Sequence, residues 1–207
     1  MDKYALSENF IEIGLEKKKL YQIISLKDFS DVAKGELGGY IESEKNLSQN
    51  GNAWIYDDAK VYGNALIAGN AVIAGDARVY EEARIYDESI VSDDVEIFGD
   101  AIVSGKASIY DNAQLSGKVR VCDNAIVFND ATLNDNVILS GNAKVYGYAR
   151  LSGNVSVCDE AVVCDAAVIH DNVIVSHKGK VCGNAQLRDR NVYDAEVVSG
   201  DEQNVSA

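Results

Sequence analysis

The sequence contains no proline and no apolar run that approaches the length of a membrane-spanning helix, which needs about 18 consecutive apolar residues. The start of the chain, MDKYALSENFIEIG, is acidic and lacks the basic segment and apolar stretch of a secretory signal. The absence of a membrane-spanning run and of a secretory signal predicts a cytoplasmic location away from the membrane. The absence of proline is typical of uninterrupted hydrogen-bonded strands, because each proline removes a donor from the ladder.

Few residues of the kinds that carry common site chemistry are present. The sequence has four cysteines, Cys122, Cys158, Cys164 and Cys182, and no CxxC pair, so a zinc ribbon is not expected. In the cytoplasm we expect all four to be reduced thiols. The glycines are never followed by the Lys-Ser or Lys-Thr pair of a phosphate-binding loop. The sequence therefore offers no motif for a zinc ribbon or a phosphate-binding loop, and we assign no metal ligands and no cofactor from these residues.

From residue 51 to residue 188 the sequence repeats every six residues in unbroken register. The fifth residue of each hexad is aliphatic and the third is mostly alanine, as in GNALIA and GNAVIA, while the first is usually Gly or Asp. In a strand, the third and fifth residues point to the same side, and Gly, Asn and Asp tolerate the positive φ of a tight corner. Each hexad therefore predicts one short strand and one corner, and the period of six excludes an amphipathic helix.

A second, longer periodicity predicts that three hexads complete one turn. Tyr62, Tyr80 and Phe98, for example, recur once every three hexads, each at the sixth place of its hexad. Residues with this spacing are expected to stack on neighbouring coils. The outward fourth and sixth residues then divide over three faces of the coil.

The pattern resembles the hexapeptide-repeat family of left-handed parallel β-helices, [LIV]-x-x-x-[STAV]-x, with Ile55 at the aliphatic place and Ala59 at the small one. The resemblance implies a triangular prism, and the left hand rests on it alone, since crossovers between parallel strands are ordinarily right-handed. At three hexads per turn, the hexads from residue 51 to residue 188 predict about 7–8 coils. We expect an all-β fold: a single-stranded left-handed parallel β-helix with an N-terminal β-hairpin cap and a short C-terminal cap.

The two ends of the chain depart from the hexads and are expected to cover the open core and edges of the prism. Residues 1–50 hold two apolar stretches around the basic turn LEKKK, which predicts a hairpin followed by an entry segment. Residues 51–188 form the β-helix, and residues 189–207 lose its register and form a C-terminal cap or tail. The entry segment also resembles that of YdcK-like hexapeptide proteins of bacteria and their phages, which are named transferases by fold alone.

One face of the predicted prism is apolar over several coils. Such a patch marks an interface or a surface covered by another part of the chain. We expect self-association through this face, as a homotrimer because hexapeptide proteins commonly are trimers, and the alternative is that the N-terminal hairpin covers it. The expected interface residues are Trp54, Tyr56, Val72, Ile90, Tyr110, Ile126, Phe128 and Tyr146.

The resemblance also implies a chemistry, acyl transfer from acetyl-CoA with a histidine at a subunit interface as general base. Of the two histidines, His170 is an outward residue of the second face and His177 occupies a corner. No loop interrupts the hexads, so no catalytic residue is assigned and His170 is the candidate. Two histidines in different columns do not supply the three zinc ligands of the carbonic-anhydrase branch of the fold. Acetyl-CoA is expected only under the acyltransferase alternative.

Cys164 and Cys182 are separated by three hexads and are expected to stack on neighbouring coils of the apolar face. Their Cα atoms would lie about 4.8 Å apart, but parallel side-chain directions fit disulfide geometry badly. We expect small, semi-apolar ladder residues here rather than a disulfide.

The acidic character of the chain follows from its corners. The formal net charge is −14, and the first and second residues of the hexads hold 18 acidic residues and 3 lysines. Asp58, Asp76 and Asp94 nevertheless stack in one predicted corner column, with Asp130 further along. This acidic edge would bind Ca²⁺ or a basic partner, and it argues against direct nucleic-acid binding, which needs clustered Lys and Arg.

The favoured function from sequence is a non-catalytic binding or scaffolding solenoid, encoded by a phage or prophage and acting on a host protein or a small ligand. The first alternative is an acetyl-CoA-dependent acyltransferase of the hexapeptide type. The second is an acidic mimic that inhibits a nucleic-acid-binding protein of the host.

Overall fold

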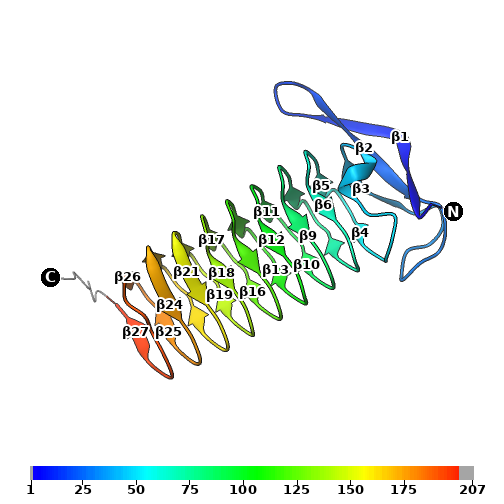
Figure 1. Ribbon diagram of the computed structural model, residues 1–207. Helices are drawn as coiled ribbons and strands as arrows, with labels where there is room; N and C mark the ends of the chain where they lie inside the picture. Colours follow the sequence, from blue (N-terminus) through cyan, green and yellow to red (C-terminus); the bar gives the residue numbers. More distant parts are fainter. Residues whose placement is uncertain (1, 201–207) are drawn as a thin grey trace.

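The hexads form a triangular prism of stacked parallel strands, with an antiparallel hairpin at its N-terminal end (Figure 1). The structure is a computed structural model and describes residues 2–200. The prism is a left-handed β-helix. Within the described residues the one helical element is a short 3₁₀ turn, η1 (Glu44–Asn46), and no helix is long and apolar enough to cross a membrane.

Three sheets make the three faces of the prism, and all their strand pairs are parallel except the two that join the first three strands of the chain to one another. Face one is the nine-stranded sheet, in the order β27 (Val197–Ser199), β25 (Lys180–Cys182), β22 (Val162–Val163), β19 (Lys144–Val145), β16 (Ile126–Val127), β13 (Ser108–Ile109), β10 (Ile90–Val91), β7 (Val72–Ile73) and β4 (Trp54–Ile55). Face two is the eleven-stranded sheet, in the order β1 (Tyr4–Ile13), β2 (Lys18–Ser25), β3 (Leu37–Ile41), β5 (Lys60–Val61), β8 (Arg78–Val79), β11 (Glu96–Ile97), β14 (Gln114–Leu115), β17 (Thr132–Leu133), β20 (Arg150–Leu151), β23 (Val168–His170) and β26 (Gln186–Arg188). Face three is the seven-stranded sheet, in the order β24 (Asn172–Val175), β21 (Asn154–Val157), β18 (Ile138–Leu139), β15 (Arg120–Val121), β12 (Ile102–Val103), β9 (Arg84–Ile85) and β6 (Leu66–Ile67).

Strand pairing between the hexads confirms that three of them complete one turn. Lys60 pairs with Arg78, for example, and Glu96 pairs with Gln114. The aromatic column stacks as expected, because the ring centroids of Tyr62 and Tyr80 lie 5.0 Å apart with an interplanar angle of 2°. The third and fifth residues of the hexads are buried throughout, so alanine and aliphatic side chains fill the prism.

The corners show why Gly and Asp alternate at the first place of the hexad. Every such residue between 51 and 188 has a positive φ, which Gly, Asn and Asp adopt at least cost. Where the residue is Asp, its carboxylate also accepts a hydrogen bond from the backbone N–H of the corner one coil further, except at Asp171, whose carboxylate contacts His170 and Arg188 instead. Asp123 accepts from Gly141 at 2.9 Å, and Asp165 accepts from Gly183 at 2.9 Å. These acidic residues therefore hold successive corners together.

The N-terminal hairpin forms as predicted, from β1 and β2, and its second strand pairs antiparallel with β3. β3 already belongs to the prism, because Tyr40 pairs in parallel with Lys60, although their separation exceeds the regular three hexads by two positions. Gly38 and Gly39 make this close approach possible. A Cβ atom on Gly39 would lie 2.6 Å from the carbonyl oxygen of Ala59.

The C-terminal residues continue the coil rather than covering it. Lys180 pairs in parallel with Val197, so their separation in the sequence is one residue shorter than the three hexads of a regular turn. An isolated bridge joins Val175 to Val192 with the same shortened separation. This deletion of a single position shifts the register without ending the stack. With both irregular coils included the prism has about nine turns, so the predicted 7–8 counted the regular hexads alone. Residues 201–207 of the predicted C-terminal cap lie outside the described residues.

Candidate functional site

His170 ends strand β23 on face two and forms a hydrogen-bonded pair with the next residue, Asp171. The ring Nδ1 lies 2.8 Å from Asp171 Oδ2. Asp171 occupies a corner with φ of 65°, which turns its carboxylate back toward the imidazole. Because Nδ1 is engaged, Nε2 is the ring nitrogen left to exchange a proton with a bound molecule.

Asp171 is also bound by the next coil. Arg188, which pairs with His170 across β23 and β26, places its Nε 2.7 Å from the same carboxylate oxygen. The hydrogen bond from His170 and the charge of Arg188 lower the pKa of Asp171. The carboxylate therefore stays ionised at neutral pH and favours a proton on Nδ1. The sequence indicated His170, but it did not indicate Asp171, whose place in the corner column made it one acidic residue among many.

The second histidine has a different setting. His177 occupies a corner with φ of 56°, and its backbone N–H donates to Asp159 at 3.0 Å. Its Nδ1 lies 3.1 Å from Ser176 Oγ and 3.9 Å from the Asp159 carboxylate. His177 therefore replaces Gly or Asp in the corner ladder and does not share a face with His170.

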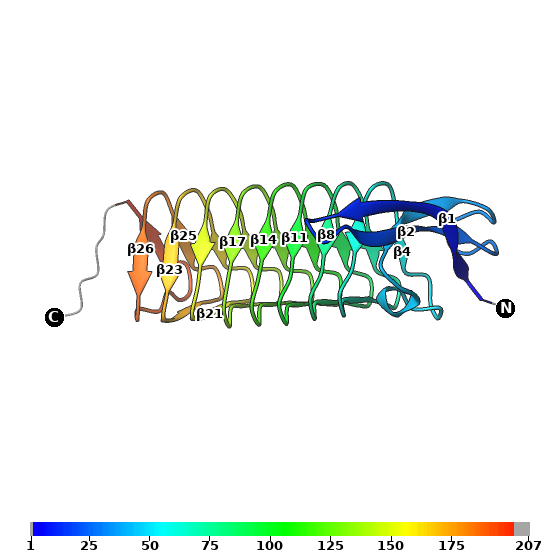
Figure 2. The same cartoon turned by 90° about the horizontal axis from the view of Figure 1, so that it is seen from above.

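The hairpin of β1 and β2 extends back along the first coils of the prism (Figure 2). A cleft that the sequence did not predict lies between its turn and face two. Its volume is about 560 Å³, and its lining includes Lys18, Lys60, Tyr62 and Arg78 beside the hairpin residues from Ile13 to Glu16. The basic turn in the sequence was the available signal, but it did not show which coils the hairpin would approach.

Positive charge in this cleft is partly compensated. Lys18 Nζ lies 5.7 Å from the centre of the Tyr62 ring and 3.1 Å from Glu42 Oε2. Lys60 Nζ lies 3.3 Å from Asp76 Oδ1. Arg78 lines the same cleft. The cleft thus presents three cationic side chains beside an aromatic ring, which suits a small anionic ligand.

The cleft and His170 are separate sites. Tyr62 and His170 belong to the same column of face two, but six turns of the prism separate them. At about 4.8 Å per coil that separation is roughly 29 Å. Within one chain, a group bound beside Tyr62 is therefore far from the imidazole of His170.

The apolar face exists, but the structure corrects its first coil. Trp54 is fully buried, with its ring 5.4 Å from Phe29 and 6.3 Å from Tyr4. Tyr56 is half-buried, and its hydroxyl donates to Asp31 at 2.9 Å. The N-terminal segment thus covers this coil, which was the alternative for part of the face. The remaining predicted interface residues are half-buried or exposed on face one, namely Val72, Ile90, Tyr110, Ile126, Phe128 and Tyr146.

The acidic edge forms one exposed corner column, as its spacing predicts. Asp76 is paired with Lys60, and Asp130 accepts a hydrogen bond from Asn112 at 3.2 Å. Asp58 contributes its backbone oxygen, not its carboxylate, to the Lys60 ammonium. Part of the charge is therefore neutralised along the edge, and a mimic of nucleic acid stays a prediction.

Comparison with known proteins supports a relationship over a short stretch. The chain is 48% identical over 63 residues to the uncharacterized acetyltransferase YdcK of Escherichia coli (strain K12). The match covers 28% of this chain and 19% of that protein. No family model matches the chain. The short match and the β-solenoid together fit a hexapeptide-repeat β-helix family.

Proposed function

We propose that the protein is an acyltransferase of the hexapeptide-repeat type, with His170 as the general base. The observation that carries the proposal is the Asp171–His170 pair, in which a carboxylate 2.8 Å from Nδ1 directs Nε2 toward an outward face. The name of the relative, an acetyltransferase, supports the same reaction class. This geometry matches a general base that another group orients.

In the proposed reaction, acetyl-CoA supplies a thioester as the acyl donor. His170 Nε2 takes the proton from an acceptor hydroxyl or amine as the acceptor attacks the thioester carbonyl. Asp171 stabilises the resulting imidazolium through Nδ1. The C–S bond then breaks, and the imidazolium returns the proton to the departing thiolate, so that the base is regenerated. Arg150 on β20 and Arg188 on β26 lie on the two coils that flank His170. Arg188 is paired with Asp171, so Arg150 is the residue that would offer positive charge to the phosphates of the donor.

The proposal requires a second copy of the chain. The His170 side chain is 39% exposed on the flat face two, and acyl transfer needs a site that excludes water. A neighbouring prism would have to close over face two at His170, because contact through face one alone, which carries Val72, Ile126 and Phe128, would leave that side chain in water. A trimer remains the favoured assembly. Light scattering that gives a concentration-independent monomer would contradict this part of the proposal.

The test is release of free thiol from acetyl-CoA in the presence of a panel of small amines and alcohols. His170→Gln should lower the rate by about 100-fold or more, because removal of a general base costs about 10²–10⁴-fold. His177→Gln is the matched control and should retain the wild-type rate, since that residue lies in a corner. Equal rates in the wild type and in His170→Gln, or no acceptor-dependent release with any member of the panel, would refute the proposal.

A second candidate function is non-catalytic binding of a small anion in the hairpin cleft. The lining by Lys18, Lys60 and Arg78 favours it. Titration calorimetry with pyrophosphate should then show binding that Arg78→Gln weakens about tenfold, whereas Lys144→Gln, on face one and outside the cleft, leaves it unchanged. The same affinity in both variants would argue against the cleft. The relative's name says nothing of phages or scaffolding, so those expectations stay predictions.

A further inference from the structure

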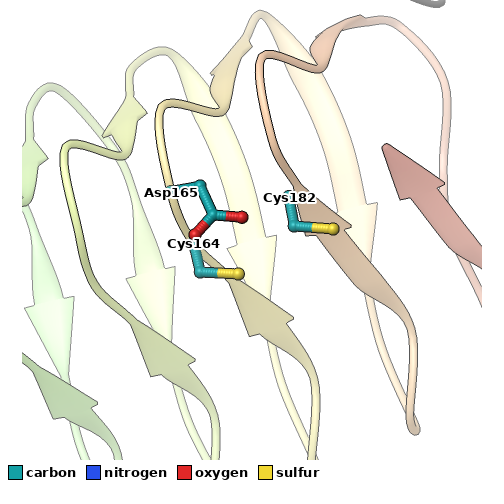
Figure 3. Close-up of side chains that lie close together, drawn as sticks. All are labelled: Cys164, Asp165 and Cys182. Atoms are coloured by element: carbon teal, nitrogen blue, oxygen red, sulfur yellow. The ribbon is translucent and has the colours of Figure 1, made fainter. Parts of the chain in front are cut away.

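Cys164, Asp165 and Cys182 come together on face one near the C-terminal end of the prism (Figure 3). Cys164 follows strand β22, and Cys182 ends strand β25 on the next coil. Asp165 occupies the corner directly after Cys164, with φ of 59°. The two sulfur atoms and a carboxylate oxygen all lie within 4.8 Å of one another.

The arrangement suits a shared metal ion better than a disulfide. Both cysteines are free thiols, and Figure 3 shows their Cβ–Sγ bonds pointing in the same direction rather than toward each other. Two ligand atoms on one tetrahedral zinc ion lie about 3.5–3.8 Å apart, given Zn–S and Zn–O bonds of about 2.3 and 2.1 Å. The contraction needed is roughly 1 Å, which small rotations of the side chains supply.

The surroundings position these ligands. Cys164 is 2% exposed, while Asp165 is exposed and Cys182 is half-buried, so one side of the cluster remains open to an incoming ion. The backbone N–H of Gly183 donates to Asp165 Oδ2 at 2.9 Å, which leaves the other carboxylate oxygen for a metal. Such hydrogen bonds commonly orient metal ligands.

The other two cysteines provide an internal contrast. Cys122 Sγ lies 3.9 Å from Asp123 Oδ2, and Cys158 Sγ lies 3.7 Å from Asp159 Oδ2. Each therefore has a carboxylate beside it, as Cys164 has. They are two turns apart in their column, however, with Ser140 between them, so neither has a second thiol on the adjacent coil.

We propose that Cys164, Asp165 and Cys182 bind one thiophilic divalent cation, with Zn²⁺ as the physiological choice. Soft thiolates select zinc over magnesium and calcium, and the carboxylate supplies a third ligand. The two thiol protons are released as the thiolates coordinate, and water fills the fourth position. Because the ligands come from two successive coils, the ion joins β22 to β25 and stabilises this part of the prism. The site is independent of the His170 proposal.

The test is titration of the fully reduced protein with Co²⁺, followed by competition with Zn²⁺. One equivalent should produce thiolate-to-cobalt charge-transfer absorption, which Zn²⁺ then abolishes. Cys164→Ser and Cys182→Ser should each lower the affinity by at least about 100-fold, and Asp165→Asn by about 10- to 100-fold. The double variant Cys122→Ser/Cys158→Ser is the matched control and should bind within about twofold of wild type.

Three outcomes would overturn the proposal. The first is wild-type protein that gives no charge-transfer absorption. The second is absorption that persists at full strength in Cys164→Ser/Cys182→Ser, and the third is absorption that the control variant loses. Far-UV circular dichroism identifies any variant that fails to fold, and the wild-type spectrum alone decides whether thiolates bind the ion.

Discussion

The N-terminal end of the prism is closed by large side chains, whereas the C-terminal coils carry most of the reactive ones. At the first end, Tyr4 and Phe29 each pack against Trp54, and the Tyr4 hydroxyl donates to the carbonyl oxygen of Leu47 at 2.7 Å. At the other end the last coil is built on small residues such as Val192 and Val198. Both histidines and three of the four cysteines lie after residue 157. The large side chains that close the core and most of the reactive side chains therefore lie at different ends of the same repeat.

The largest expected effect is a loss of stability at the N-terminal end, where large side chains close the core. Trp54→Ala removes a fully buried indole, which should lower the free energy of unfolding of the N-terminal coils by about 3–5 kcal/mol. Val198→Ala, the matched change at the other end, should cost about 2 kcal/mol or less. Urea denaturation followed by far-UV circular dichroism measures both. A similar cost for the two variants would remove the energetic difference between the ends.

A second test concerns the room available for a side chain at each end. A Cβ atom on Gly39 would lie 2.6 Å from Ala59 O, whereas one on Gly179 would lie 3.0 Å from Ser176 O. Gly39→Ala should therefore destabilise the protein by about 1–3 kcal/mol through overpacking. Gly179→Ala restores the residue usual at that place of the hexad and should change stability by less than about 1 kcal/mol. Equal costs in urea denaturation would show that the entry strand is no more tightly packed than the last coils.

A third, smaller effect is the pH dependence that Lys3 gives to the closed end. Lys3 is 1% exposed and donates to Ala53 O at 2.7 Å. Burial, followed by the charge of Lys27, lowers its pKa to about 8 from the ordinary value of 10.5. Between these values the unfolded chain binds more protons than the folded one, so stability should rise with pH, by on the order of 2 kcal/mol.

Comparison with Lys3→Met isolates this contribution. The tyrosines and cysteines that titrate in the same range are present in both proteins, so the difference between the two curves reports Lys3. At pH values well below the folded-state pKa of about 8 the difference should be constant, because Lys3 is protonated in both states there. A difference that stays flat up to pH 10.5 would mean that the buried amine keeps its ordinary pKa.

The regular part of the fold could be predicted because the residue types within each hexad determine its local structure. The inward alanine and aliphatic residues, the positive-φ corners and the stacked column of Tyr62, Tyr80 and Phe98 all follow from spacing. The irregular coils could not be found in this way. The longer offset at Tyr40 and the shorter one at Lys180 break the period on which the prediction depended.

The candidate sites were predicted less well because they depend on contacts between coils or with the hairpin. His170 was identified as outward, but its pairing with Asp171 requires the conformation of one corner. Trp54 was assigned to an interface because periodicity does not show that Tyr4 and Phe29 cover it. Cys164 and Cys182 were correctly stacked, yet only the corner geometry brings Asp165 to them.

Hydrogen–deuterium exchange with and without acetyl-CoA tests most directly the claim that chemistry belongs to the C-terminal coils. Addition of acetyl-CoA should slow exchange in the peptides that contain β20, β23 and β26. If the imidazole itself contributes to binding, His170→Gln should lose this protection. The hairpin, β1 and β2, should exchange at the same rate in both conditions. Protection confined to the hairpin and β5, or no protection at saturating acetyl-CoA, would contradict the account.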